Sequence, residues 1–148
     1  MIYALALASN QYPAVHLGKC LQRLSELGNL EIASIFVIPC RDGIGADYWN
    51  TACLLTSKIA LNPLLECLKQ YELETGRIRP SHHISLDIDL IAWGDNLQEM
   101  QFNPKKLPLA LDVKIPLYEL WQHAEIEYQT DQQYPRVVLS ATDLNERI

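Results

Sequence analysis

The sequence predicts a single α+β domain in which helices pack on a four-stranded antiparallel sheet. Short apolar runs of strand length alternate with two stretches of helical periodicity, and glycine or proline separates them. The 148 residues suit one ordinary domain. Hydrophobic residues make up 49% of the chain and charged residues 20%, which is typical of a folded globular protein and not of a disordered one.

The first half of the chain predicts a strand, a helix and two further strands. Residues 2–8 are apolar and end at a Ser-Asn pair, as a buried strand ending in a turn does. Apolar residues then recur at intervals of three and four, which predicts a helix that ends at Gly28. The β-branched residues of 30–38 predict a second strand, and 48–57 a third. Residues 40–47, with two glycines and two aspartates, predict the loop between them.

The second half predicts another helix and a fourth strand. Asn62 followed by Pro63 is a typical helix start, and Gly76 a typical end. Residues 86–93 alternate between apolar and polar, which predicts a strand. The order β-α-β-β-α-β indicates the ferredoxin-like arrangement.

The C-terminal third gives weaker signals. We expect a short helix over 117–124, after Pro116. Residues 1–124 are therefore interpreted as the folded unit, and 125–148 as a polar C-terminal extension of the same domain.

Bulk properties exclude several classes of protein. A net charge of −6 argues against a nucleic-acid-binding protein, which needs a basic face. The N-terminus lacks the basic region and long apolar run of a secretory signal, and no stretch is apolar for long enough to span a membrane. None of the four cysteines belongs to a CxxC motif, so we expect buried thiols in a reducing compartment. Together these features predict a cytoplasmic protein.

Asp87 and Asp89 form the sharpest candidate site. Residues two apart in a strand face the same way, so the two carboxylates project together while Leu86, Ile88 and Leu90 project into an apolar layer. Adjacent like charges repel each other unless a cation compensates them. A hard divalent ion such as Mg²⁺ binds one or two carboxylates together with substrate phosphates. The alternative is an edge strand that exposes two acids to solvent.

Two further clusters accompany the aspartates. Arg77, Arg79, His82 and His83 precede them in one short segment, which indicates either a phosphate grip or cations near the end of a helix. Tyr48 and Asn50 share one face of the third strand, with Trp49 on the other. A ring beside an amide suits a flat, hydrogen-bonding heterocycle, although aromatic core residues would give the same pattern.

Competing chemistries have less support. His82 and His83 could join Asp87 and Asp89 in a transition-metal site, but adjacent histidines point apart in an extended chain. No serine lies in a nucleophile-elbow pattern, and the chain lacks the glycine-rich loop of P-loop nucleotide-binding proteins.

The three clusters occur in this order in one known family. The chain resembles the 6-hydroxymethyl-7,8-dihydropterin pyrophosphokinases over about residues 2–95, with a weaker similarity at PLYEL (116–120). Four segments carry the resemblance: YALALASN, ADYWNTA, YELETGRIR and SLDIDLIAWG.

The resemblance implies transfer of pyrophosphate from ATP to the hydroxymethyl group of a pterin in folate biosynthesis. It implies two Mg²⁺ ions on Asp87 and Asp89, which bridge the ATP phosphates and, with Arg77 and Arg79, form the catalytic centre. It also implies specific contacts to both substrates. Pterin contacts would come from Tyr48, Asn50, Pro39, Cys40 and Arg41, and nucleotide contacts from Glu72, Arg77, Arg79, His82 and His83.

The chain departs from the family in the loop before the aspartates. The family carries several arginines and a tryptophan there, whereas this chain reads PSHHIS, with Ile84 at the place of the last arginine. Downstream, the family's ATP contacts and its second pterin-stacking aromatic have no clear counterpart in LPLALDVKIP, where Lys105, Lys106 and Lys114 are partial substitutes. Two interpretations follow. One is a divergent pyrophosphokinase, and the other is a catalytically degenerate relative that binds a pterin, a nucleotide or another protein.

Overall fold

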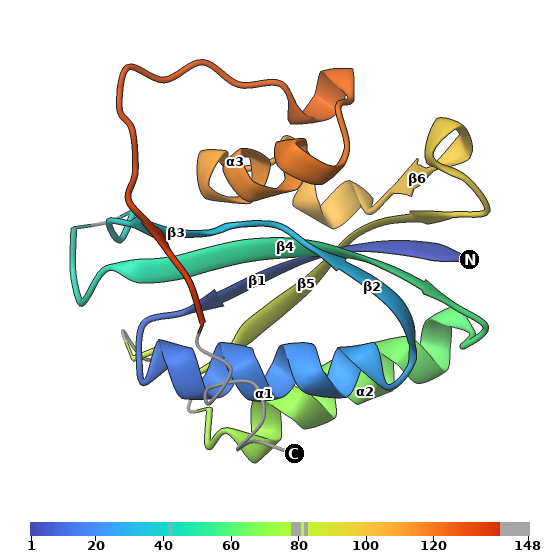
Figure 1. The fold of residues 1–148 in the computed structure, drawn as a ribbon, viewed down its shortest axis with the longest axis horizontal. Helices are drawn as coiled ribbons and strands as arrows, with labels where there is room; N and C mark the ends of the chain where they lie inside the picture. The colour runs from blue at the N-terminus through green and yellow to red at the C-terminus, as the bar shows by residue number, and fades with distance from the viewer. Residues whose placement is uncertain (42, 78–80, 82, 140–148) are drawn as a thin grey trace.

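One antiparallel sheet separates two helical layers in the computed structural model, which describes residues 1–41, 43–77, 81 and 83–139. The helices α1 (Pro13–Ser25) and α2 (Leu61–Glu74) cover one face of the sheet. The helix α3 (Leu111–Leu120) covers the other face, together with short 3₁₀ turns (Figure 1). The central strands therefore have helices on both sides, which explains the continuous apolar run of residues 2–8.

The sheet has seven strands instead of the four predicted. Its order is β6-β5-β1-β4-β3-β7, and β2 also pairs with β4, with every ladder antiparallel. The strands are β1 (Ile2–Ser9), β2 (Gly28–Ile32), β3 (Ile35–Ile38), β4 (Tyr48–Ser57), β5 (Asp87–Gly94), β6 (Gln101–Phe102) and β7 (Arg136–Val137). The mixed α+β class is confirmed. The extra strands β6 and β7 have two residues each, which is too short for a periodic pattern.

The strand predicted over 30–38 is broken in two. β2 and β3 pair with successive parts of β4, and the break lies at Ala33 and Ser34. The backbone amide of Ser34 donates to Glu119 Oε1 of α3 at 2.7 Å, so this amide pairs with the helix and not with β4. A contact between residues so far apart in the chain leaves no signal in the local sequence.

Two predicted helix boundaries are wrong. α1 ends at Ser25, and Gly28 instead begins β2, where a Cβ atom would lie 2.1 Å from the carbonyl oxygen of Thr56. Gly28 therefore permits a close approach of two strands and does not cap the helix. α2 begins at Leu61 with Ala60 as its N-cap, so Asn62 lies inside the first turn. The end at Gly76 is confirmed, with a φ of +79° that favours glycine.

α3 begins six residues earlier than predicted and contains Pro116 in its interior. Proline removes one helical hydrogen bond. Ile115 and Leu117, on either side of it, are buried at 4% and 0% exposure. Their burial against the sheet outweighs the unfavourable propensity of proline, which the local sequence cannot reveal.

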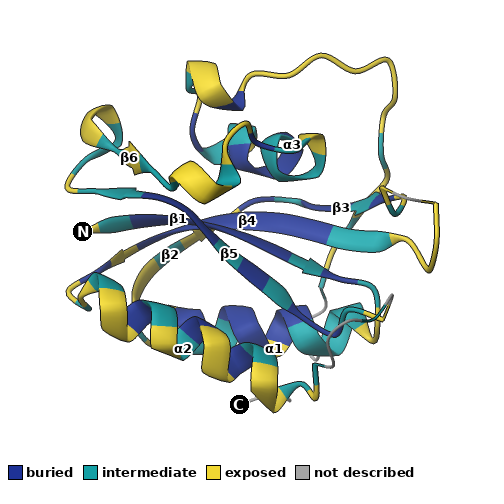
Figure 2. Cartoon of the chain, turned by 180° about the vertical axis from the view of Figure 1, so that it is seen from behind, coloured by how far each residue is buried: buried dark blue, intermediate teal, exposed yellow. Residues whose placement is uncertain are grey.

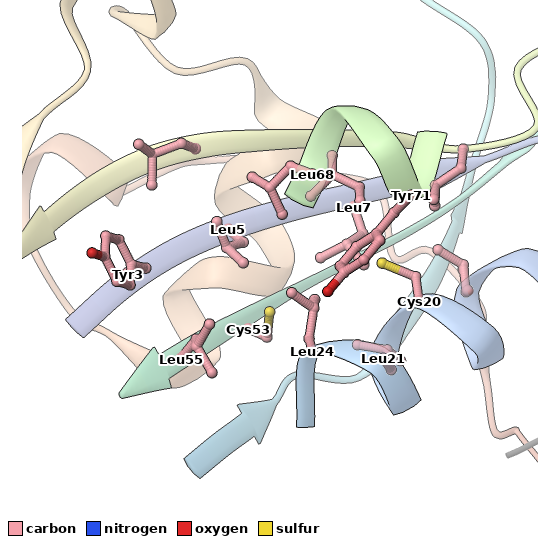
Figure 3. Close-up of a cluster of buried hydrophobic side chains, with 14 of the residues drawn as sticks. Tyr3, Leu5, Leu7, Cys20, Leu21, Leu24, Cys53, Leu55, Leu68 and Tyr71 are labelled. Atoms are coloured by element: carbon pink, nitrogen blue, oxygen red, sulfur yellow. The ribbon is translucent and has the colours of Figure 1, made fainter. Parts of the chain in front are cut away.

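The two faces of the sheet carry side chains of different size. On β1, Tyr3, Leu5 and Leu7 point into the core beneath α1 and α2, which also contains Cys20 and Cys53 (Figure 3). Burial raises the pKa of the Cys53 thiol to about 12. Ala4 and Ala6 point towards α3. Figure 2 shows that the central strands β1, β4 and β5 are mostly buried between the two helical layers. The small side chains on the α3 face leave room for a pocket.

The C-terminal segment packs on the domain as far as the structure describes it. Ile126 is fully buried in the core beneath α3, and β7 pairs with β3. No helix among the described residues is both long and apolar enough to cross a membrane.

Candidate active site

The side chains of Asp87 and Asp89 leave β5 on the face that α3 covers. Asp87 lies opposite Ala8 of β1, and Asp89 lies opposite Ala6. Ile88 points the other way, into the core beneath α1 and α2. This alternation confirms the shared direction predicted for the two carboxylates. β1 pairs with β5 along its whole length, whereas β6 pairs only with Ala92 and Trp93. The aspartates therefore lie on a part of β5 that has a strand neighbour on one side among the described residues.

Each carboxylate has one basic neighbour. Lys106 Nζ donates to Asp89 Oδ1 at 2.9 Å, and Arg77 Nη1 lies 3.5 Å from Asp87 Oδ1. Burial and the nearby charge of Asp87 raise the pKa of Asp89, while Lys106 and Arg41 act in the opposite direction. Burial and repulsion together outweigh these two cations, so a further cation beside the pair would favour the ionised form of Asp89.

Arg77 and Glu72 fix the start of β5 to the end of α2. Arg77 Nη1 donates to the carbonyl oxygen of Leu86 at 2.9 Å, and Glu72 Oε2 accepts from the amide of Ile88 at 2.9 Å. The two side chains lie 3.9 Å apart, and that of Arg77 is only 9% exposed. These contacts hold Asp87, the first of the two aspartates, in a fixed position relative to α2.

Two pockets meet at the aspartates. One, here called the Tyr48 pocket, is lined by Tyr48 and Asn50 and has a volume of about 290 Å³. The other, here called the lysine pocket, is lined by Lys69, Lys105 and Lys106 and has a volume of about 750 Å³. The second volume is within the usual range for small-molecule sites, and the first is at its lower end. Asp87, Asp89 and Arg41 line both. A group held between these two spaces would touch a ligand in each.

The Tyr48 pocket lies over the small side chains of the sheet. Tyr48 and Asn50 line it together, whereas Trp49 packs against the core beneath α1 and α2. Asn50 is 5% exposed, and its Nδ2 donates to the carbonyl oxygen of Tyr48 at 3.5 Å. The predicted division of these three residues between the faces of the strand is confirmed. Asp112 and Val113, at the start of α3, complete the lining.

An ion pair joins the loop after β3 to α3. Arg41 Nε and Nη2 donate to the two carboxylate oxygens of Asp112 at 2.9 and 2.7 Å. The Arg41 side chain is 70% exposed, whereas that of Asp112 is 13% exposed. The hydrogen bond that Arg41 donates to Asp112 raises the pKa of Arg41. Cys40 also lines the pocket, while Pro39 is exposed and does not line it.

The lysine pocket is the more cationic of the two. Lys69, Arg77, Lys105 and Lys106 line it, beside the apolar side chains Leu61, Leu65 and Trp93. Glu72 lines it as well. This composition suits a ligand that carries both negative charge and a flat or apolar part.

Residues 4–129 match the sequence model of the 7,8-dihydro-6-hydroxymethylpterin-pyrophosphokinase (HPPK) family. The chain belongs to the HPPK family. A search among curated proteins found no match to it. Members of the HPPK family use ATP and Mg²⁺ for pyrophosphoryl transfer in folate biosynthesis.

The basic segment that the HPPK resemblance assigned to the nucleotide is only partly visible. Arg79 and His82 lie outside the described residues. His83 is exposed and lines neither the Tyr48 pocket nor the lysine pocket. Ile84, at the place of an HPPK arginine, lines the Tyr48 pocket, and its backbone exchanges two hydrogen bonds with Asn10, at 2.9 and 2.6 Å.

Sequence reasoning missed Asp112 and gave Lys106 only as a substitute cation. Asp112 follows an apolar stretch with no motif around it, and its place in the pocket depends on how α3 crosses the sheet. Lys106 reaches Asp89 from a 3₁₀ turn, η2 (Pro104–Lys106), which is too short to give a periodic pattern in the sequence. The only available signal was an adjacent pair of lysines after a proline.

Proposed function

We propose that this chain transfers a pyrophosphoryl group from ATP to the hydroxymethyl group of 6-hydroxymethyl-7,8-dihydropterin. The observation that carries the proposal is the position of Asp87 and Asp89 between two pockets of different chemistry. Family membership supplies the reaction class, and this geometry supports a place for each of its substrates.

The residues present fit Mg²⁺. Asp87 and Asp89 offer carboxylate oxygens side by side. Burial, and after it the charge of Asp87, raises the pKa of Asp89, and a divalent ion beside the pair would act against both. No group of three or more His, Cys, Asp or Glu side chains suited to a metal occurs in the described part of the chain. The remaining ligands would therefore be water and substrate phosphates, as is usual for this ion. When bound, Mg²⁺ supplies charge neutralisation and alignment of the reacting oxygens.

The Tyr48 pocket suits the pterin. The ring of Tyr48 offers a stacking surface, and the buried amide of Asn50 offers a donor and an acceptor to a heterocycle edge. The alanine side chains beneath leave the depth that a flat ring needs. A pterin held there has its hydroxymethyl arm directed towards the aspartates in this proposal, because they form the wall shared with the other pocket.

The lysine pocket suits the nucleotide. Its lysines and Arg77 offer the positive charge that a triphosphate requires. Lys106 Nζ donates to Asp89 and also lines this pocket, so in this proposal it binds a phosphate when a metal ion takes its place at the carboxylate. In this way the pocket replaces part of the charge that the missing loop arginines would supply.

The reaction then needs little covalent help from the protein. The hydroxymethyl oxygen attacks the β-phosphorus of ATP, and the bond from that phosphorus to the α-bridging oxygen breaks, so that AMP leaves and the hydroxyl proton is released. Holding two substrates across one wall supplies proximity, and fixed cations supply charge stabilisation. The buried network of Arg77 and Glu72 keeps the aspartate strand in position.

Pterin-dependent release of AMP tests the proposal. We expect AMP to form from ATP only when both Mg²⁺ and the pterin are present. If both substrates bind and no AMP forms, the chain is instead the binding-only relative of the second interpretation, and the proposal is wrong.

Lys106→Gln tests the assignment of the lysine pocket. We expect the affinity for a non-hydrolysable ATP analogue with Mg²⁺ to fall by about fivefold to tenfold, because one charge-assisted hydrogen bond to a phosphate is lost. Calorimetric titration measures the change. Lys58→Gln, at an exposed position outside the pocket, is the matched control and should bind as the wild type does. Equal affinity in both variants would remove Lys106 from the nucleotide site.

A further inference from the structure

The ion pair between Arg41 and Asp112 is strongly asymmetric. Asp112 is set into the wall of the Tyr48 pocket with 13% of its side chain exposed, whereas 70% of the Arg41 side chain faces solvent. The arginine belongs to the loop between β3 and β4, and the aspartate to the first turn of α3. The less exposed partner thus lies in the pocket wall, and the exposed one reaches it from a loop.

Asp112 presents both carboxylate oxygens to parallel donors. The guanidinium fills them with two N–H groups, at 2.9 and 2.7 Å. A carboxylate this far from solvent is costly without a partner, so a ligand that displaced Arg41 would have to supply an equivalent pair of donors. The pocket therefore favours a ligand with two adjacent N–H donors on one edge.

A pterin carries such an edge. Its 2-amino group and N3–H lie side by side and point the same way, as two N–H groups of a guanidinium do. Tyr48 and Asn50 line the same pocket as Asp112, so a ring placed against them can turn this edge to the carboxylate. Arg41 also lines the lysine pocket, so its side chain can lie there when a ligand takes its place at Asp112.

We propose that Asp112 is a specificity-determining residue whose carboxylate accepts hydrogen bonds from the 2-amino and N3–H groups of the pterin. Arg41 occupies the same two oxygens until the pterin binds. This inference rests on the proposed function and goes beyond it, because it assigns the recognition of one edge of the substrate to a residue outside the aspartate pair. Binding exchanges one two-donor partner of Asp112 for another, so its charge stays paired throughout.

The main alternative is that the pair only anchors the loop to α3. The two explanations differ in what they predict for Arg41. If the pair is an anchor, Arg41→Ala and Asp112→Asn break the same contact and weaken pterin binding alike. If Arg41 is a placeholder, only the change at Asp112 weakens pterin binding, and Arg41→Ala leaves it equal or stronger.

The first experiment is a titration of 6-hydroxymethyl-7,8-dihydropterin into each variant, with Mg²⁺ and an ATP analogue present. We expect Asp112→Asn to lower pterin affinity about tenfold or more and Arg41→Ala not to lower it. Asp95→Asn, at an exposed position after β5, is the control for an Asp-to-Asn change. Equal losses for Asp112→Asn and Arg41→Ala would overturn the inference. Asp112→Ser is tested in parallel, so that poor folding of one variant does not decide the result.

The second experiment uses a 2-oxo analogue of the pterin, in which a carbonyl replaces the amino group. Wild type should reject it, because two oxygens would face each other, whereas Asp112→Asn should bind it as well as or better than the pterin, since an amide can donate. An unchanged preference in Asp112→Asn would overturn the inference while leaving the proposed function intact. Failure of the wild type to bind the pterin at all would overturn both.

Discussion

Replacing either Asp87 or Asp89 by alanine is expected to abolish Mg²⁺-dependent nucleotide binding and to lower the rate of pyrophosphoryl transfer by about a thousandfold or more, the scale on which removal of a main electrostatic stabiliser acts. Each variant removes half of the carboxylate pair that stands between the two pockets. A single remaining carboxylate is a weak ligand for an ion that must also hold phosphates. Titration with an ATP analogue and an assay of AMP release measure the two effects.

The fold should survive both substitutions. The two side chains point into the pockets, with 36% and 30% exposure, and the core beneath β5 is made by their neighbours. Far-UV circular dichroism and thermal unfolding check this point. Asp95→Ala, on the turn after β5, is the matched control and should keep full activity. Nucleotide binding that depends on Mg²⁺ in either Asp87→Ala or Asp89→Ala would contradict the metal site.

Replacing Tyr48 by alanine is expected to weaken pterin binding by about 1–3 kcal/mol, the range measured for an aromatic ring that stacks on a base. The ring is part of the pocket lining and lies on the same face of β4 as Asn50. Its removal takes away the flat surface and leaves the amide in place. Nucleotide affinity should change little, because Tyr48 does not line the lysine pocket.

Tyr48→Phe separates the ring from its hydroxyl group. If stacking is the contribution of Tyr48, the phenylalanine variant should bind the pterin nearly as well as the wild type. Calorimetric titration of the pterin into both variants gives the comparison. An alanine variant with wild-type pterin affinity would exclude Tyr48 from the binding site.

The sequence was most informative where a segment is buried on both faces of the sheet. The runs 2–8, 48–57 and 86–93 match β1, β4 and β5 to within one residue at each end. Burial on both faces makes β1 a continuous apolar run, and β5 is marked by the alternation of its buried apolar residues with Asp87 and Asp89. The break between β2 and β3 was not predictable, since it depends on a hydrogen bond from Ser34 to Glu119 of a distant helix. The place of Pro116 inside α3 has a similar cause, namely tertiary burial that overrides a local rule.

The candidate site divides in the same way. The shared direction of Asp87 and Asp89, and of Tyr48 and Asn50, follows from the two-residue period of a strand and was predictable. That these two pairs lie on the same side of one sheet depends on the register between strands. The contributions of Lys106 and Asp112 come from a short 3₁₀ turn and from the crossing of α3, which no local pattern encodes. The resemblance to the HPPK family included the first set of residues, gave Lys106 only as a substitute cation and did not include Asp112.

In the proposed site, one wall of two aspartates joins a pterin pocket to a nucleotide pocket. The most direct test is calorimetric titration of 6-hydroxymethyl-7,8-dihydropterin into the wild-type protein, with Mg²⁺ and a non-hydrolysable ATP analogue present and then with each left out. We expect tight pterin binding that requires both, because the metal and the nucleotide phosphates complete the shared wall. Absence of pterin binding under every condition, or pterin binding that is indifferent to Mg²⁺ and nucleotide, would contradict it.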